Sequence, residues 1–213
     1  DFMEYEDRFE EIDVPVLHVS GWFDDQLIGT HLNFVGMTMS ARSAKARKNQ
    51  RLVIGPWLHQ VNKATKIGFL DFGPSAVIDL QGLKLRWFDY WLKETSSGIM
   101  DEPPVKLFIM GANTWRGEYE WPLRRTQYTE FYIHSRGSAN SLYGDGILNR
   151  TLPAREPPDT FSYNPDNPVP LIYDPIVLQV GGPDDYRPIE RRDDILVYTS
   201  KPCLLYTSDA ADE

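Results

Sequence analysis

The sequence has few cysteines, no long apolar run and no excess of basic residues. A single cysteine, Cys203, leaves no partner for an intrachain disulfide. No stretch approaches the roughly 20 apolar residues that a membrane-spanning helix needs. A net charge of −9 argues against the basic face that a nucleic-acid backbone requires. We therefore expect neither a nucleic-acid partner nor a membrane partner.

The composition suits a folded protein with a packed core, because 41% of the residues are hydrophobic and 13% are aromatic. The chain starts at Asp1 in an acidic segment, and we expect it to be part of a longer protein. The end, Cys203 to Glu213, resembles the codon-by-codon translation of a transposon-type sequencing adapter. Residues 203–213 are therefore expected to be an artefact and carry no functional argument here, while a natural strand over Leu204–Thr207 is the alternative.

The first half of the sequence alternates strand-like and helix-like segments. Residues 14–20 and 51–55 are apolar on both faces, which is typical of buried parallel strands. Helical spacing of apolar residues predicts helices over about 26–47 and 76–93. The second of these carries a predicted apolar stripe of Leu80, Leu83, Trp87, Trp91 and Leu92. This order of elements indicates an α/β sheet covered by helices.

From Pro103 onward the sequence consists of short strand-like runs separated by turn signals. Strands are predicted at 105–110, 127–134 and 195–199, and Gly and Pro pairs divide the segments between them. Such a pattern favours an antiparallel β-sandwich or jelly roll. The predicted fold class is thus α/β followed by all-β, with a boundary in the segment 94–104. We place the two domains at residues 1–98 and 99–202.

Two short motifs end the two predicted parallel strands: Gly21-Trp22-Phe23-Asp24 and Gly55-Pro56-Trp57-Leu58-His59. If the strands are neighbours, both loops open on the same edge of the sheet, and Asp24 can meet His59. A carboxylate that orients an imidazole is the acid-base pair of a Ser-His-Asp relay. Taken singly, Asp24 is equally well explained as a helix cap and His59 as a polar loop residue. Together, and in this order, they favour catalysis.

The nucleophile of such a relay is missing from the sequence, because no G-x-S-x-G occurs in its 213 residues. The relay acid and base are therefore predicted without their serine.

These motifs, together with Leu85-Arg86-Trp87-Phe88-Asp89-Tyr90-Trp91-Leu92-Lys93, resemble the bacterial cocaine-esterase and X-Pro dipeptidyl-peptidase family of serine hydrolases. Pro103 to Gly111 and Trp115 to Leu123 look like the start of that family's C-terminal jelly-roll domain. The resemblance covers about residues 12–202. It implies the C-terminal part of an α/β-hydrolase sheet followed by a jelly-roll β-sandwich. It also implies that Asp24 is the relay acid and His59 the general base, with the serine and an oxyanion tyrosine before Asp1.

Two departures from the family pattern bear on the site. Phe23 stands where another aromatic residue is usual, and Asp25 offers a second carboxylate beside Asp24. Five residues next to the motifs are predicted to contact substrate: Trp22, Asp25, Gln26, Leu27 and Trp57. The aromatic ones among them are equally often core residues.

Other polar residues are weaker candidates. His18 lies within an apolar strand and is expected in the core. His31 lies on the predicted helix, and His134 lies in the predicted β region, far from any partner motif. No spacing of His, Cys and carboxylates resembles a zinc site, so no metal is predicted. The pairs 184–185 and 193–194 are acidic but lack calcium-loop spacing, which favours solvated turns.

The sequence thus predicts part of a serine hydrolase that cleaves small ester or peptide substrates through an acyl-enzyme and needs no cofactor. The alternative is a non-catalytic β-sandwich that binds carbohydrate or protein, since more than half of the chain is predicted as β. Ester, dipeptidyl-peptide and β-lactam substrates all stay open. No specific residue supports the homodimer that the β domain could form.

Overall fold

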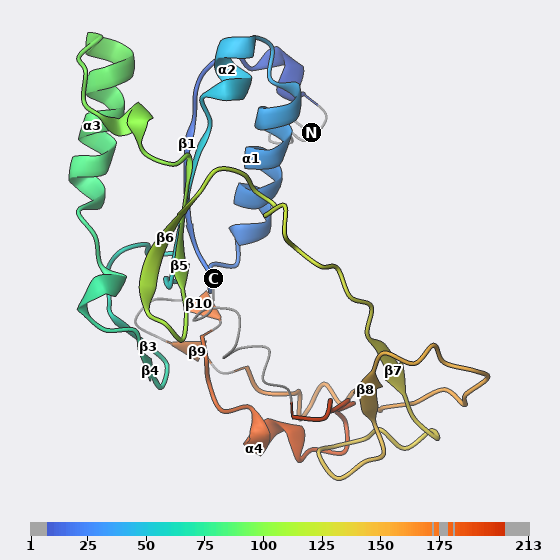
Figure 1. Ribbon diagram of the computed structural model, residues 1–213. Coiled ribbons are helices and arrows are strands. Elements are labelled where there is room, and N and C mark those ends of the chain that lie inside the picture. Colours follow the sequence, from blue (N-terminus) through green and yellow to red (C-terminus); the bar gives the residue numbers. More distant parts are fainter. Residues whose placement is uncertain (1–7, 172, 175–178, 181, 203–213) are drawn as a thin grey trace. The chain divides into compact units, whose positions relative to one another are not determined.

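The computed structural model describes residues 8–171, 173–174, 179–180 and 182–202 (Figure 1). The predicted adapter-derived tail, residues 203–213, lies outside the described residues. The chain divides into two compact units. Unit 1 comprises Asp1–Thr126 and Asp174–Pro183, and unit 2 comprises Gln127–Tyr173 and Asp184–Glu213.

Unit 1 is built around a four-stranded mixed sheet in the order β1-β2-β5-β6. The strands span Leu17–Gly21, Arg51–Gly55, Val105–Ile109 and Thr114–Glu118. β1 and β5 both pair with β2 in parallel, and β6 is antiparallel to β5. The structure confirms the predicted parallel strands at 14–20 and 51–55, the first with a later start, and shows that they are neighbours.

Helices cover both faces of this sheet, with α1 (Leu27–Ser40) and α2 (Ala44–Lys48) on one side and α3 (Leu80–Lys93) on the other (Figure 1). On the α1 side, Phe34 packs against Leu52 and Ile54 of β2 and two residues of β5. On the α3 side, Val53 packs against Leu83 and Trp87. Because successive side chains of a strand point to opposite faces, β2 is buried along its whole length.

The predicted helix over 26–47 is wrong in one respect, because it is two helices. α1 ends at Ser40, and Ala41 turns away from helical geometry with φ −54° and ψ 149°. Ser43 then starts α2, since its hydroxyl oxygen accepts a hydrogen bond from the Ala46 N–H at 3.1 Å. The Arg47 guanidinium closes the bend by donating to the Ala41 carbonyl at 2.5 Å.

The predicted helix over 76–93 begins later, at Leu80, because the Asp79 carboxylate caps it by accepting the Gly82 N–H at 2.8 Å. Leu80, Leu83 and Trp87 are buried as predicted. Leu92, in contrast, is 75% exposed, since it follows Trp91 directly and lies about 100° around the helix from it. The apolar stripe therefore excludes Leu92.

Short elements complete unit 1. Three 3₁₀ helices span Phe9–Glu11, Pro74–Ala76 and Ile99–Asp101. β3 (Lys66–Ile67) and β4 (Leu70–Asp71) form a small hairpin after the second motif. No helix in the described part of the chain is long and apolar enough to cross a membrane.

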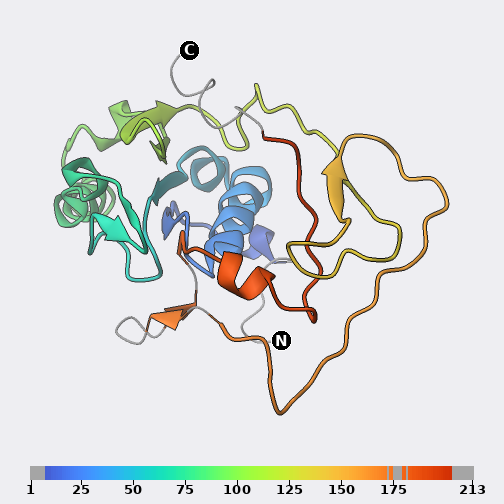
Figure 2. The same ribbon diagram turned by 90° about the horizontal axis from the view of Figure 1, so that it is seen from below.

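Unit 2 has little regular structure in the residues described. β7 (Tyr132–His134) pairs antiparallel with β8 (Ile147–Asn149), and α4 spans Arg187–Glu190. β9 (Tyr173–Asp174) pairs with β10 (Gln179–Val180), and β10 belongs to the second segment of unit 1. Residues 150–171 contain neither helix nor strand (Figure 2).

Two predicted strands of the second half are shorter than expected. The run 127–134 is a strand only from Tyr132, and the run 195–199 contributes only isolated bridges at Leu196 and Thr199. Antiparallel strands are present, while the jelly roll stays a prediction.

The boundary between domains also stays a prediction. β5 and β6 follow residue 98 and belong to the sheet of unit 1, whose first segment continues to Thr126.

Candidate active site

The two motif loops lie side by side at the carboxyl ends of β1 and β2. Their backbones continue to pair past the strands, since the Trp22 N–H donates to the Gly55 carbonyl at 2.8 Å and the Phe23 N–H to the Trp57 carbonyl at 3.0 Å. A Cβ on Gly21 would lie 1.9 Å from the Trp57 carbonyl oxygen. Only glycine therefore allows the loops to approach this closely.

Asp24 is held by hydrogen bonds to both of its carboxylate oxygens. Its Oδ1 accepts the Gln26 N–H at 3.0 Å and lies 3.1 Å from His59 Nδ1, while Oδ2 accepts the Ser20 hydroxyl at 2.9 Å. Burial raises the pKa of Asp24, but the hydrogen bonds from Gln26, His59 and Ser20 outweigh it and bring the pKa below its ordinary value. The carboxylate is therefore ionised at neutral pH.

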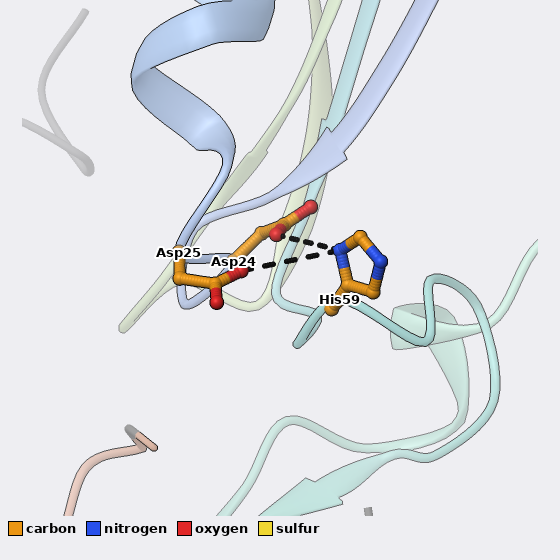
Figure 3. Close-up of side chains that lie close together, drawn as sticks. All are labelled: Asp24, Asp25 and His59. Atoms are coloured by element: carbon orange, nitrogen blue, oxygen red, sulfur yellow. Dashed lines mark hydrogen bonds and ion pairs between the residues drawn. The ribbon is translucent and has the colours of Figure 1, made fainter. Parts of the chain in front are cut away.

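His59 is oriented by this carboxylate (Figure 3). Because an ionised carboxylate only accepts, His59 Nδ1 must carry the proton in their hydrogen bond. The second ring nitrogen points away from both aspartates (Figure 3). The His59 side chain is 53% exposed and that of Asp24 only 6%, so the acid is covered while the imidazole is accessible.

Asp25 is a second carboxylate near the imidazole. Its Oδ1 lies 4.0 Å from His59 Nδ1, and its side chain is 64% exposed. Asp24 is closer and better covered, which favours it as the partner of His59.

Asp24, Asp25 and His59 form a group whose ligand atoms lie within 4.8 Å of one another, a donor set that a divalent metal could use. Metal bonds to such ligands are about 2.0–2.2 Å long, so an ion bound to both Asp24 Oδ1 and His59 Nδ1 would replace their hydrogen bond. The direct contact of 3.1 Å fits a relay pair without rearrangement.

The predicted substrate contacts differ in accessibility. Asp25 and Gln26 are exposed, whereas Trp22 and Leu27 pack against the core on the α1 side. Trp57 is 1% exposed, and its indole N–H donates to the Ala76 carbonyl at 2.7 Å. It nevertheless lines a cavity of about 160 Å³ that also includes Leu58, Gln60, Lys63, Ala64, Lys66, Ile67 and Gly68. The roles of these residues in substrate binding stay predictions. In this structure Trp57 is a packed core residue.

The remaining histidines each have a partner elsewhere. His18 is buried in β1 and lies 2.9 Å from Gln50 Oε1, as expected of a core histidine. His31 accepts the indole N–H of Trp121. In unit 2, His134 contacts Glu156 Oε1 at 2.8 Å, a pairing that no spacing in the sequence indicated.

One aspartate of each acidic pair in unit 2 is partnered by a neighbouring arginine. Arg187 donates to both carboxylate oxygens of Asp185, and this interaction lowers the pKa of Asp185 to about 2. Arg192 holds Asp194 in the same way. In each pair an arginine two residues away in the sequence holds one carboxylate, and the expectation of solvated turns stays a prediction.

Sequence reasoning missed Ser20, which is 0% exposed and bonds to Asp24. A hydroxyl inside an otherwise apolar strand, four residues before the motif aspartate, was the available signal.

Comparison with known proteins relates the chain to a family. Residues 97–203 match the family described as the X-Pro dipeptidyl-peptidase C-terminal non-catalytic domain. Cocaine esterase from Rhodococcus sp. (strain MB1 Bresler) is 34% identical over 201 residues, which are 92% of this chain and 33% of that protein. The crystal structure of an aminopeptidase from a marine sediment archaeon, Thaumarchaeota archaeon, has a similar fold. Its TM-score is 0.66 at 24% identity, over 92% of this chain and 32% of that chain.

The chain spans a third or less of the length of the curated relatives it matches. Asp24 and His59 lie outside the residues that match the non-catalytic domain. The chain belongs to the hydrolase family of the cocaine esterases and X-Pro dipeptidyl-peptidases.

Proposed function

We propose that this chain supplies the acid and the base of a serine-hydrolase relay, with Asp24 as the acid and His59 as the base. The observation that carries the proposal is the 3.1 Å contact between Asp24 Oδ1 and His59 Nδ1, at the ends of neighbouring parallel strands. The nucleophilic serine would come from a part of the protein outside these 213 residues. The fold would be the C-terminal part of an α/β-hydrolase sheet, continued by a jelly roll.

In the proposed reaction, the serine Oγ attacks the carbonyl carbon of an ester or amide while its proton passes to the second ring nitrogen of His59. Asp24 keeps the ring oriented and stabilises the imidazolium. The carbon–oxygen or carbon–nitrogen bond then breaks, and His59 returns the proton to the leaving group. Water repeats these steps on the acyl-enzyme and releases the acid. The exposed Asp25 and Gln26 are the predicted contacts best placed to meet substrate.

The alternative, a non-catalytic binding module, requires that Asp24 serve only as a helix cap. The N-cap of α1 is instead Gln26, and its side chain makes no capping bond. Asp24 Oδ1 faces the imidazole as well as the Gln26 N–H, which supports the relay. For residues 97–203, whose matched domain is described as non-catalytic, we propose no catalytic role.

The first test measures which ring nitrogen of His59 carries the proton, by long-range proton–nitrogen NMR of the 213-residue chain at about pH 9, where an imidazole is neutral. We expect the Nδ1–H tautomer to dominate and its ratio to the Nε2–H tautomer to fall at least about fivefold in Asp24→Ala, because a charge-assisted hydrogen bond is lost. Asp25→Ala is the matched control and should change the ratio little.

An unchanged ratio in Asp24→Ala would contradict the relay. NMR spectra of the same samples with and without a chelator test whether a metal ion is bound to Asp24 and His59. If a longer protein that includes the serine is available, Asp24→Asn should lower kcat about 10⁴-fold, as in other relays.

A further inference from the structure

Ser20 is a polar residue in the most buried part of unit 1. It is the fourth residue of β1, pairs in register with Ile54 of β2, and has no exposed surface. Its hydroxyl donates to Asp24 Oδ2 at 2.9 Å. A buried hydroxyl is costly unless it is hydrogen-bonded, so this contact is the reason a serine is tolerated here.

Ser20 is unsuited to be the missing nucleophile. A nucleophile must reach a substrate carbonyl and give its proton to the imidazole, whereas this side chain is fully buried and donates to the carboxylate.

Its position behind Asp24 suggests a different role. The Gln26 N–H and His59 Nδ1 both contact Oδ1, whereas the Ser20 hydroxyl holds the other oxygen, Oδ2. Asp25, 4.0 Å from the same imidazole nitrogen and 64% exposed, is a competing carboxylate one residue away. The chain therefore contains two acids within reach of one base, and Ser20 bonds to one of them.

We propose that Ser20 is a positioning residue that fixes the Asp24 carboxylate with Oδ1 toward His59 and thereby makes Asp24, rather than Asp25, the partner of the imidazole. This inference rests on the proposed relay. It assigns Ser20 no contact with substrate, since the residue acts through Asp24. A hydrogen bond to a charged group in a water-excluded site is among the stronger hydrogen bonds in proteins. A single hydroxyl is therefore sufficient to hold the Asp24 carboxylate in this orientation.

The test compares His59 tautomer ratios by the same NMR method in Ser20→Ala, Asp25→Ala and the double variant. Ser20→Ala should lower the ratio of Nδ1–H to Nε2–H tautomer about threefold or more, because Asp24 is free to turn away. In the Ser20→Ala background, Asp25→Ala should now lower the ratio further, while in the native background it should not. Ser20→Ala should also raise the pKa of Asp24, since one of the hydrogen bonds that lower it is gone.

Ser43→Ala is the matched control, because it removes a serine hydroxyl that accepts a hydrogen bond in the α2 cap, with a comparable effect on stability. A purely structural role for Ser20 would lower stability in both variants and leave both tautomer ratios native. That result, with Asp24→Ala still lowering the ratio, would overturn the inference about Ser20 and leave the relay intact. If Asp24→Ala itself has no effect, the relay fails first.

Discussion

His18 shows how a single buried residue couples stability to pH. The ring lies 2.9 Å from Gln50 Oε1 and packs edge-on against Phe34 at a centroid distance of 5.6 Å. Gln50 is itself fixed, because its amide donates to the Ala46 carbonyl at 2.7 Å. Burial lowers the pKa of His18, and the hydrogen bond with Gln50 opposes this only in part. The folded protein therefore favours the neutral imidazole.

The expected consequence is a loss of stability in mild acid. Below about pH 6.5 the unfolded chain binds a proton at His18 that the folded chain does not, so the free energy of unfolding falls by up to about 1.4 kcal/mol per pH unit. This continues until the pH reaches the lowered pKa of the folded state. Urea unfolding between pH 5 and 8 measures the slope.

His18→Leu should be less stable at pH 8, because Gln50 Oε1 loses its partner, but its stability should depend less on pH. The control is Gln50→Leu, which removes the hydrogen-bond partner of His18 but keeps the buried imidazole, and it should retain the pH dependence. Equal slopes for native protein and His18→Leu would rule out His18 as the titrating group.

At the scale of the elements, the approach of the two motif loops depends on Gly21. A side chain there would meet the Trp57 backbone, which belongs to the neighbouring strand's loop and has no room to withdraw. Gly21→Ala should therefore lower the free energy of unfolding by about 1–3 kcal/mol and loosen the Asp24–His59 contact. Gly29→Ala is the opposite case, since nothing lies within 4 Å of its Cβ position in α1.

Gly29→Ala should raise stability by about 0.5–1 kcal/mol through helix propensity. Urea unfolding of Gly21→Ala and Gly29→Ala measures both changes in the free energy of unfolding. Equal changes in the free energy of unfolding for the two variants would show that the close approach of the loops does not require glycine at position 21.

The elements also show what could be predicted from sequence. β2 was predicted with its observed bounds, because a run buried on both faces leaves an unbroken apolar signal. The nearness of Asp24 and His59 followed from two strands being parallel neighbours. The break between α1 and α2 did not, since it depends on the Ser43 cap and on Arg47 reaching back to Ala41. Contacts between distant segments leave no local pattern.

Unit 2 was over-predicted as strand for a related reason. Alternation of apolar residues indicates a strand only if a partner strand and a covering layer exist, yet Phe131 and Ile133 are 43% and 58% exposed. Ser20 was missed because the significance of a lone hydroxyl in a strand appears only once Asp24 folds back over it.

At the scale of the whole molecule, the sheet, the relay pair and the missing motif lead to one expectation about activity. Asp24 and His59 are in hydrogen-bonding position, but no G-x-S-x-G occurs in the 213 residues, and Ser20 is buried. Without the serine that we propose comes from elsewhere, no acyl-enzyme can form and the proposed relay pair has no hydroxyl to activate. The contact between Asp24 and His59 can therefore be intact in a chain that hydrolyses no substrate.

We expect the 213-residue chain to hydrolyse p-nitrophenyl acetate and an Ala-Pro-anilide no faster than its own His59→Ala variant, the control that accounts for background hydrolysis by other side chains. A fluorophosphonate probe, which labels activated serines, should label neither protein. The opposite result, hydrolysis that disappears in His59→Ala together with probe labelling, would mean that a serine within this chain is the nucleophile. Because the relay geometry is measured separately by the His59 tautomer ratio, an inactive chain with a native ratio is the outcome that supports a serine supplied from elsewhere.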